Sequence, residues 1–211
     1  MAITHDIPAE TPPAPSGAVV PRPGRALLDI PSHGLITCDD VEGFADEIGH
    51  RFELLEGTLI VMAPPNAGHQ IAQMELIRVL LSSVPSTHRV LAAPFDWRLS
   101  AHTKFEPDIV VIPKGVIPRR QNFVTDPPLL AIEILSPSTK YYDRGVKRPA
   151  YAEYGLTHFW IVDPEAPSLL ALRRNAAGDE FDVVANFGPA EQVALAEPFP
   201  VEFAVADLLG E

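Results

Sequence analysis

Cysteine is nearly absent from this chain of 211 residues, because Cys38 is the only one. A single cysteine excludes an internal disulfide and any zinc site built from several cysteines. It also gives little support to a cysteine hydrolase, since Cys38 precedes an expected helix start and no base can be assigned to it. A serine hydrolase is equally unsupported, because the sequence lacks the GxSxG nucleophile elbow.

Long apolar runs are missing as well. No segment approaches the roughly 20 uninterrupted apolar residues that span a bilayer. The N-terminal MAITHDIPAE has neither the basic region nor the apolar region of a secretory signal. We therefore expect a cytoplasmic protein without a membrane partner. With 46% hydrophobic residues, the chain can bury a sizeable core, and its length suits one α/β domain better than two.

Positive charge is scarce, because 16 Lys and Arg residues stand against 28 Asp and Glu residues, a formal net charge of −12. Proteins that hold nucleic acid by neutralising phosphates usually present a basic face. A carboxylate-rich metal site accounts for only a few of the negative charges. The count leaves three possibilities open: the cations gather around one cleft, nucleic-acid binding is weak and salt-dependent, or the partner is of another kind.

The distribution of proline suggests a tail followed by one domain. Residues 1–34 are rich in Pro, Ala and Gly and lack apolar periodicity, so we expect a flexible tail there and a single domain over residues 35–211. A helix is expected to start near Thr37, a suitable N-cap with Asp40 three residues on. Its apolar face would carry Phe44 and Ile48.

Local patterns predict a hairpin and a long helix next. Two apolar strands flank Glu56-Gly57 within residues 51–62, and Gly57 suits a tight turn. Asn66 can cap a helix that runs to about Val84. At helical spacing, the buried stripe of this helix is expected to consist of Ile71, Met74, Ile77 and Leu81.

Further strands are expected over residues 90–99, 108–112, 129–135 and 158–163. The second and third are nearly continuous apolar runs, typical of central strands covered on both faces. Residues 139–154 have helical character but contain a proline. From residue 168 onward the chain alternates like antiparallel strands, in LLALRR, EFDVVANF and VALAEPFPVEF. Trp97 and Trp160 are expected in the core.

Two acidic residues interrupt apolar strands. Asp108 opens PDIVVI after a proline, and Glu133 lies within LLAIEIL. A carboxylate in such a run is unfavourable to bury unless it is paired or bound to a cation. On neighbouring strands the two would suit a hard divalent ion such as Mg²⁺. Taken singly, Glu133 could face an edge or accept backbone N–H groups, and an Asp after Pro is ordinary at a strand start.

Other charged residues carry weaker signals. Asp143 and Lys147 are four residues apart, and Tyr151 continues the same stripe. On spacing alone, an exposed ion pair on a solvated helix face is the favoured interpretation of the first two. Glu53 lies in the first hairpin strand and His69 near the start of the long helix. A lone histidine at a helix start is more often a surface or capping residue than a ligand.

The order of these segments resembles a known family. RFELLEGTLIVMAPPNAGHQ, EPDIVVI and LLAIEILSPSTKYYDRGVKRPAYAEYGLTHFWIVDPE are similar to the Uma-type restriction endonuclease family of the PD-(D/E)xK nuclease superfamily. The resemblance is close over about residues 37–165 and looser beyond. It implies a restriction-endonuclease-like α/β fold, in which helices flank a mixed β-sheet. An N-terminal helix and hairpin and extra antiparallel C-terminal strands would complete this fold.

The resemblance also implies a function and site residues. Asp108 matches the PD aspartate and Glu133 the second acid of a metal-dependent DNA endonuclease. The lysine that usually follows two residues later is replaced by Leu135, and the family position on the next helix maps to Lys147. Glu53 matches a supporting acid, which gives Asp108, Glu133 and Glu53 as ligands of Mg²⁺, with Mn²⁺ as an alternative.

Further roles follow from the same resemblance. His69 matches an active-site histidine. The SPST turn offers Ser136 and Ser138 as substrate contacts together with Lys140, although a turn fixed by Pro137 explains this segment equally well. Cleavage of both DNA strands favours a homodimer. The acidic net charge and Leu135 favour the alternative, a catalytically inactive binding or assembly module with a nuclease fold.

Pro149 departs from the family pattern. A proline fits the first turn of a helix but removes a hydrogen bond and clashes deeper inside it. The helix must therefore begin near residues 145–148 or bend there. Either outcome could turn Lys147 away from the site, and Lys140 would then be the substitute cation.

Overall fold

A computed structural model of the chain describes residues 34–42, 51–118, 120–137 and 140–210. The predicted tail over residues 1–34 lies almost entirely outside this part, as do Phe44, Ile48 and Ser138. The expected helix start near Thr37 is confirmed. The Thr37 N–H donates to Asp40 Oδ2 at 2.8 Å, the Asp40 N–H donates back to Thr37 Oγ1 at 3.2 Å, and residues 38–42 are helical.

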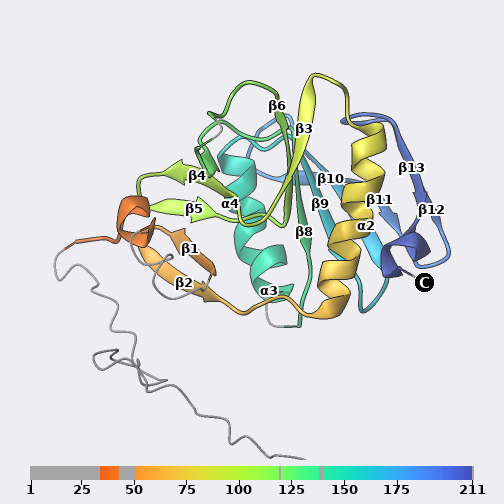
Figure 1. Cartoon of the computed structure of the whole chain (residues 1–211), viewed down its shortest axis with the longest axis horizontal. Helices are drawn as coiled ribbons and strands as arrows, with labels where there is room; N and C mark the ends of the chain where they lie inside the picture. The colour runs from red at the N-terminus through yellow and green to blue at the C-terminus, as the bar shows by residue number, and fades with distance from the viewer. Residues whose placement is uncertain (1–33, 43–50, 119, 138–139, 211) are drawn as a thin grey trace, which may run out of the picture.

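The centre of the molecule is a six-stranded mixed sheet in the order β11-β10-β9-β8-β6-β3 (Figure 1). β8 and β9 run parallel, whereas all other pairs are antiparallel. The strands are β3 (His88–Ala92), β6 (Ile109–Pro113), β8 (Leu130–Ile134), β9 (His158–Asp163), β10 (Ser168–Arg174) and β11 (Phe181–Phe187). The fold class predicted from the sequence, a mixed sheet flanked by helices, is confirmed.

A smaller five-stranded sheet, in the order β2-β1-β5-β4-β7, lies beside the first. It contains the predicted hairpin, whose turn residues Glu56 and Gly57 have φ of 47° and 76°, as a tight two-residue hairpin turn requires. Its strands are β1 (Arg51–Leu55), β2 (Thr58–Met62), β4 (Asp96–Ser100), β5 (Thr103–Phe105) and β7 (Phe123–Val124).

One predicted strand, over residues 90–99, is wrong as a single element. The strand ends before Ala93-Pro94 and the chain then enters the other sheet, so β3 belongs to the large sheet and β4 to the small one. A proline cannot donate to a strand ladder, which explains the break. The predicted C-terminal strands are confirmed as β10, β11 and a separate two-stranded sheet of β12 (Gln192–Leu195) and β13 (Val201–Ala204).

The core lies on both faces of the large sheet. Val111 and Ile132 pack with α2 (Ala67–Ser83), while Val110 and Ala131 pack on the opposite face with α4 (Arg148–Glu153). All residues of β8 and the first four of β6 are buried, so the prediction of central strands is confirmed. Trp97 and Trp160 are each 1% exposed and lie in the core as expected.

The predicted helix after Asn66 is confirmed, but its predicted buried face is wrong. The Asn66 side chain accepts from the His69 N–H at 2.9 Å and α2 ends before Val84. Met74 and Leu81 are 63% and 68% exposed, and Ile71 is also exposed; only Ile77 of the predicted stripe packs on the core. The buried residues are His69, Ala72, Leu76, Val79 and Leu80. Apolar side chains occur on all faces of this helix, so the periodicity of the sequence does not determine which face is buried.

The crossover between the parallel strands β8 and β9 contains three short helical pieces. They are α3 (Lys140–Tyr142), a π-helical turn η1 (Asp143–Lys147) and α4. Outside this crossover, a 3₁₀ turn η2 (Val205–Leu209) follows β13. Pro149 is the second residue of α4, and the residues directly before it belong to η1, so the chain is helical without interruption over residues 140–153. The helix therefore begins before the predicted residues 145–148, and the irregularity next to the proline is the π-helical turn. None of the helices in the described residues could cross a membrane.

Candidate active site

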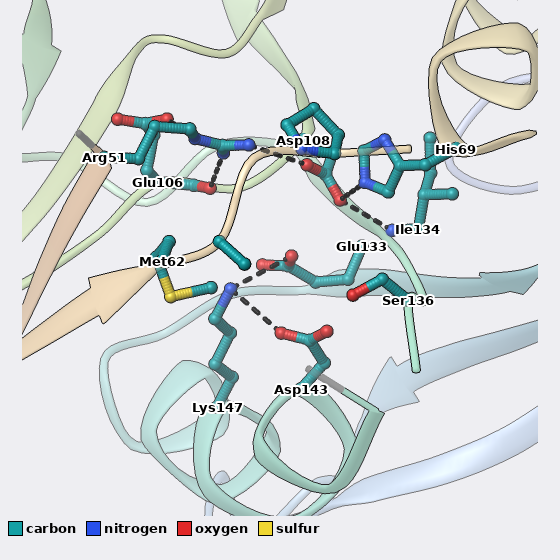
Figure 2. Close-up of a pocket in the computed structure, with 12 residues that line it drawn as sticks. Arg51, Met62, His69, Glu106, Asp108, Glu133, Ile134, Ser136, Asp143 and Lys147 are labelled. Carbon is teal, nitrogen blue, oxygen red and sulfur yellow. Dashed lines mark hydrogen bonds and ion pairs between the residues drawn. The ribbon is translucent and has the colours of Figure 1, made fainter. Parts of the chain in front are cut away.

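One pocket gathers residues from both sheets, from α2 and from the crossover (Figure 2). Its volume of about 20 Å³ leaves room for roughly one water-sized occupant. It is lined by Arg51, Met62, Ala63, Pro65, His69, Glu106, Asp108, Glu133, Ile134, Ser136, Asp143 and Lys147. Most residues predicted from the sequence to act together therefore share this pocket.

Strand register brings the two predicted acids together. β6 and β8 pair with Ile109 opposite Ile132, so Asp108, directly before β6, faces the position of Glu133. Because opposite residues of neighbouring strands project from the same face, the two carboxylates lie side by side. The Ile134 N–H donates to Asp108 Oδ2 at 2.8 Å and ties the two strand ends.

Asp108 is held in its ionised form by several donors. Besides Ile134, His69 Nε2 lies 3.1 Å from Oδ2, and the Arg51 guanidinium lies 3.6 Å from Oδ1. Burial by itself opposes ionisation, but the His69 hydrogen bond, the charge of Lys147 and the Ile134 N–H together lower the pKa of Asp108. His69 is thus in the pocket, in contact with an acid, as the family resemblance implied.

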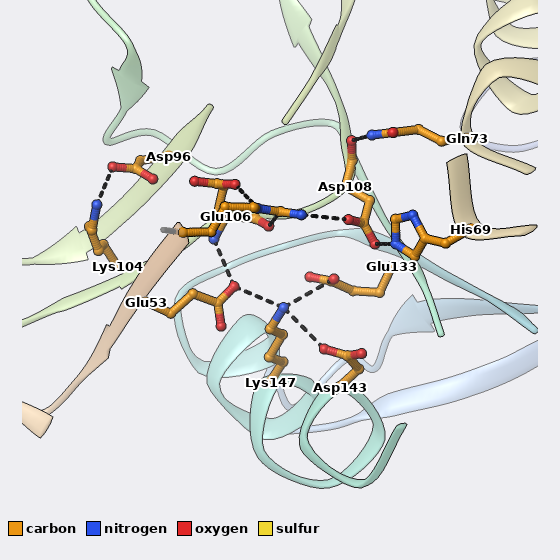
Figure 3. A network of polar contacts seen from close by, with 11 residues as sticks. Glu53, His69, Gln73, Asp96, Lys104, Glu106, Asp108, Glu133, Asp143 and Lys147 are labelled. Atoms are coloured by element: carbon orange, nitrogen blue, oxygen red, sulfur yellow. Dashed lines mark hydrogen bonds and ion pairs between the residues drawn. The ribbon is translucent and has the colours of Figure 1, made fainter. Parts of the chain in front are cut away.

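Lys147 lies at the centre of a buried acidic cluster (Figure 3). Its side chain is 2% exposed, and its Nζ lies 2.9 Å from Glu53 Oε1, 3.0 Å from Glu133 Oε2 and 3.1 Å from Asp143 Oδ1. Burial alone would lower the pKa of this amine, yet the surrounding carboxylates hold it well above its ordinary value. The exposed ion pair favoured by the spacing of Asp143 and Lys147 is therefore a buried one.

Pro149 does not turn Lys147 away from the pocket. The wide turn η1 directly precedes α4, and Asp143 and Lys147 are its two buried residues. The substitute cation, Lys140, lies elsewhere: its Nζ is 2.7 Å from Asp163 Oδ2, its side chain is 47% exposed, and it does not line the pocket. Of the two predicted substrate contacts that the structure describes, Ser136 lines the pocket and Lys140 does not.

Glu133 and Glu53 are buried acids whose pKa values are raised. The Tyr151 hydroxyl donates to Glu133 Oε1 at 2.6 Å. Burial, reinforced by the charges of Asp143, Asp108 and Glu53, raises the pKa of Glu133 well above its ordinary range, although Lys147 acts in the opposite direction. Burial also raises the pKa of Glu53, whose Oε1 accepts the Glu106 N–H at 3.0 Å. Glu53 Oε2 is buried without a hydrogen-bond partner among the described residues.

The donor set of the pocket fits a hard cation. Four carboxyl groups line the pocket, those of Glu106, Asp108, Glu133 and Asp143, and the carboxyl group of Glu53 contacts Lys147 beside them. These five carboxyl groups stand against two cations, Arg51 and Lys147. Such an excess of buried oxygen donors requires protons or a bound cation, and carboxylate oxygens are the ligands that Mg²⁺ prefers.

The ligand cage expected from Asp108, Glu133 and Glu53 is not formed as these side chains lie here. Within the described part of the chain, no three His, Cys, Asp or Glu side chains are arranged to hold a metal ion. The reason is local: the Lys147 amine occupies the space between Glu53 and Glu133, while His69 and Arg51 hold Asp108. Metal binding at this pocket stays a prediction.

Sequence reasoning missed three residues of the pocket. Arg51 donates from Nε to Glu106 and from Nη2 to the Glu106 carbonyl at 3.1 Å. A signal was present, because Arg51 and Glu53 are two residues apart on β1 and so face the same side. Glu106 lies two residues before Asp108, and no sequence pattern indicated that it belongs to the pocket. Asp143 was recognised only as a surface ion-pair partner.

Comparisons with known proteins agree with this geometry. The sequence model of a family described as "Uma2: Putative restriction endonuclease" matches residues 38–208. The chain belongs to this family. The resemblance noted in the sequence is thereby confirmed, both in its closely similar part and over the C-terminal strands, where it is looser. No curated protein matches the chain.

A solved structure supports the fold of this Uma2 family member. It is titled as a putative nuclease belonging to DUF820 from Anabaena variabilis ATCC 29413. The two chains share 24% sequence identity with a TM-score of 0.65, over 83% of this chain and 98% of that one. At this identity the likeness establishes the fold and leaves the chemistry to be argued from the pocket.

The central position of Lys147 predicts a large loss of stability on its removal. Lys147→Met leaves three carboxylates buried without their shared cation, so we expect it to lower the free energy of unfolding by roughly 3–5 kcal/mol. Lys140→Met, which breaks the half-exposed pair with Asp163, should lower it by about 1 kcal/mol or less. Urea unfolding without divalent ions measures both, and equal losses would contradict the assigned role of Lys147.

The raised pKa of Glu133 predicts a pH dependence of stability. The folded protein binds a proton at Glu133 more tightly than the unfolded chain, where the pKa is near 4.5. The resulting stabilisation is complete below the unfolded pKa and is lost as the pH rises through the folded pKa. Without divalent ions, Glu133→Gln should therefore lose less stability than the wild type as the pH rises above about 5. Parallel unfolding curves across this range would refute the assignment.

Proposed function

We propose that this protein is a divalent-metal-dependent endonuclease that hydrolyses phosphodiester bonds in DNA. The observation that carries the proposal is the convergence of Asp108, Glu133 and Lys147 on one pocket in a member of the Uma2 family. Two adjacent carboxylates and a buried ammonium group are the set that a PD-(D/E)xK nuclease needs. In this chain the lysine comes from η1 and not from the strand of Glu133.

Asp108 and Glu133 would hold Mg²⁺ or Mn²⁺, with Glu53 as a further ligand. When bound, such an ion lowers the pKa of a water molecule and offsets negative charge on the phosphate. The need for it is electrostatic. The pocket already carries an excess of carboxylates, and a substrate phosphate adds further negative charge.

The chain's own residues fix the orientation of both acids. His69 Nε2 and the Ile134 N–H hold Asp108 Oδ2, and the Tyr151 hydroxyl holds Glu133 Oε1. Each carboxylate therefore has one oxygen fastened to the protein and one directed toward a cation, Arg51 for Asp108 and Lys147 for Glu133. Groups held in this way need little reorganisation during the reaction.

Lys147 is proposed to orient the attacking water and to stabilise the negative charge that develops on the phosphate. Its high pKa keeps the amine charged at neutral pH. An ammonium group has three N–H donors, and carboxylate oxygens of Glu53, Glu133 and Asp143 lie within 3.1 Å of Lys147 Nζ. Asp143 Oδ1 accepts no hydrogen bond among the described residues, so we propose that one donor of the amine serves the water or the phosphate. Ser136 at the pocket, and Ser138 and Lys140 nearby in sequence, are proposed substrate contacts, and a homodimer is proposed for cleavage of both strands.

The net charge of −12 and the replacement of the usual motif lysine by Leu135 favour a second candidate, a binding or assembly module that keeps the nuclease fold without catalysis. The three carboxylates around Lys147 Nζ also oppose the approach of a negatively charged phosphate. The two candidates differ in their response to metal. The enzyme binds Mg²⁺ or Mn²⁺ at Glu133, whereas an inactive module melts at the same temperature with and without these ions.

Cleavage of supercoiled plasmid and single-stranded DNA in Mn²⁺ tests the proposal. We expect Asp108→Asn to reduce the cleavage rate by a factor of about 100 or more, because it removes a charged ligand of the proposed ion that offsets negative charge on the reacting phosphate. EDTA should abolish cleavage by the wild type.

Asp96→Asn is the matched control for this experiment. Asp96 is also buried and ion-paired, at 2.6 Å from Lys104 Nζ, but it does not line the pocket. This variant should keep the wild-type rate. The proposal fails if Asp108→Asn cleaves as fast as the wild type, or if cleavage persists in EDTA.

A further inference from the structure

The charges of this acidic protein are separated between the two edges of the large sheet. After residue 174 the sequence has eight acidic residues and no Lys or Arg. The seven of these that the structure describes, all exposed, lie on or beside β11, β12 and β13. They are Asp179, Glu180, Asp182, Glu191, Glu197, Glu202 and Asp207. β11 is one edge of the six-stranded sheet.

The opposite edge, β3, has the reverse character. Between residues 84 and 124 the only acidic residues are Asp96, Glu106 and Asp108, and all three are buried. The cations Arg89, on β3, and Lys114, directly after β6, are exposed. So is Arg120, in the loop that follows. We call Arg89, Lys114 and Arg120 the basic edge.

The cations of the basic edge lack the partners that exposed cations have elsewhere. Among the described residues, none forms an ion pair with a member of the basic edge. In contrast, three arginines outside it are paired: the exposed Arg78 with Glu75, the half-buried Arg148 with Glu180 and the exposed Arg173 with Glu197. Unpaired cations gathered at one edge of a protein with a net charge of −12 form a surface suited to an external polyanion.

The local structure holds these cations together. The Lys114 N–H donates to the Thr87 carbonyl at 2.8 Å, and Lys114 and Arg89 line the same hollow of about 400 Å³. Gln121, which follows Arg120, lines a second hollow with Arg89. Arg89 therefore lines both hollows, Lys114 lines the first, and Arg120 directly precedes a residue that lines the second.

The distance from the basic edge to the candidate active site suits a duplex backbone. β6 begins directly after Asp108 and ends directly before Lys114, so the strand itself separates the two positions. Six residues of strand span about 20 Å at roughly 3.3 Å per residue. That length corresponds to about six base pairs at 3.4 Å per step. Arg89, which lies on β3 opposite Ile112, falls between these two positions.

We propose that the basic edge binds the phosphate backbone of duplex DNA about six base pairs from the pocket. The inference rests on the proposed nucleic-acid substrate and adds the surface that holds it. The acidic residues of the β11 side repel the backbone, so the duplex runs along β3 and away from β11. The net charge of −12 is then compatible with DNA binding, because the seven exposed acidic residues described above lie on the far side of the sheet from the basic edge.

The salt dependence of duplex binding tests this surface. The duplex must be long enough to reach from the pocket to Lys114. Binding is measured by fluorescence anisotropy in EDTA, so that no cleavage occurs. Each phosphate contact contributes about 0.9 to the slope of log K against log salt. Changing Arg89, Lys114 and Arg120 together to Gln should therefore reduce the slope by about 2.7.

The matched control removes the same charge from paired positions, as Arg78→Gln, Arg148→Gln and Arg173→Gln. It should leave the slope close to that of the wild type. An equal reduction in both triple variants would show that overall charge alone is responsible and would overturn the proposal. An unchanged slope in the basic-edge variant would also overturn it.

Two further outcomes separate this inference from the proposed catalysis. A reduced slope in the basic-edge variant, together with a wild type that cleaves no DNA, supports the surface and refutes the nuclease. Sedimentation measures the oligomeric state of both triple variants and so tests whether the basic edge binds the acidic β11 side of a second copy instead of DNA. A basic-edge variant that loses an oligomer and not DNA binding would overturn the assignment to DNA.

Discussion

One buried ammonium group, that of Lys147, holds three carboxylates within 3.1 Å, and the placement of several elements depends on this contact. Glu53 comes from the small sheet, Glu133 from the centre of the large sheet, and Asp143 from the crossover that contains Lys147 itself. Buried carboxylates are unfavourable unless a cation accompanies them. The cluster therefore joins both sheets and the crossover at one point, and the same point is the floor of the candidate active site.

Much of the fold follows from patterns that local physics determines. The Glu56-Gly57 turn, the Asn66 cap and the apolar runs of β6 and β8 each depend on few neighbouring residues, and each was predicted correctly. The inner face of α2 was not, because apolar residues occur around the whole helix and only packing against the sheet selects Leu76 over Met74. The exchange of sheets at Pro94 is likewise a tertiary choice.

The candidate site shows the same division. The proximity of Asp108 and Glu133 follows from two acids in neighbouring apolar strands, and the structure confirms it. The inward direction of Lys147 could not be read from its spacing with Asp143, which equally fits a solvated helix face. It depends on the π-helical turn before Pro149. Arg51 could not be predicted as a site residue, because an arginine at the start of a strand is common and its contacts with Glu106 and Asp108 depend on the tertiary structure.

The central claim is that the excess of carboxylates around Asp108 and Glu133 exists to bind a divalent cation, and calorimetric titration with Mg²⁺ or Mn²⁺ near pH 6 tests it most directly. Because the pKa of Glu133 is raised in the metal-free protein, binding should release protons, which titration in buffers of different ionisation enthalpy counts. We expect saturable binding with proton release in the wild type, and binding without that release in Glu133→Gln, at least about tenfold weaker. Absence of binding, or binding that is identical in the two proteins, would contradict the account.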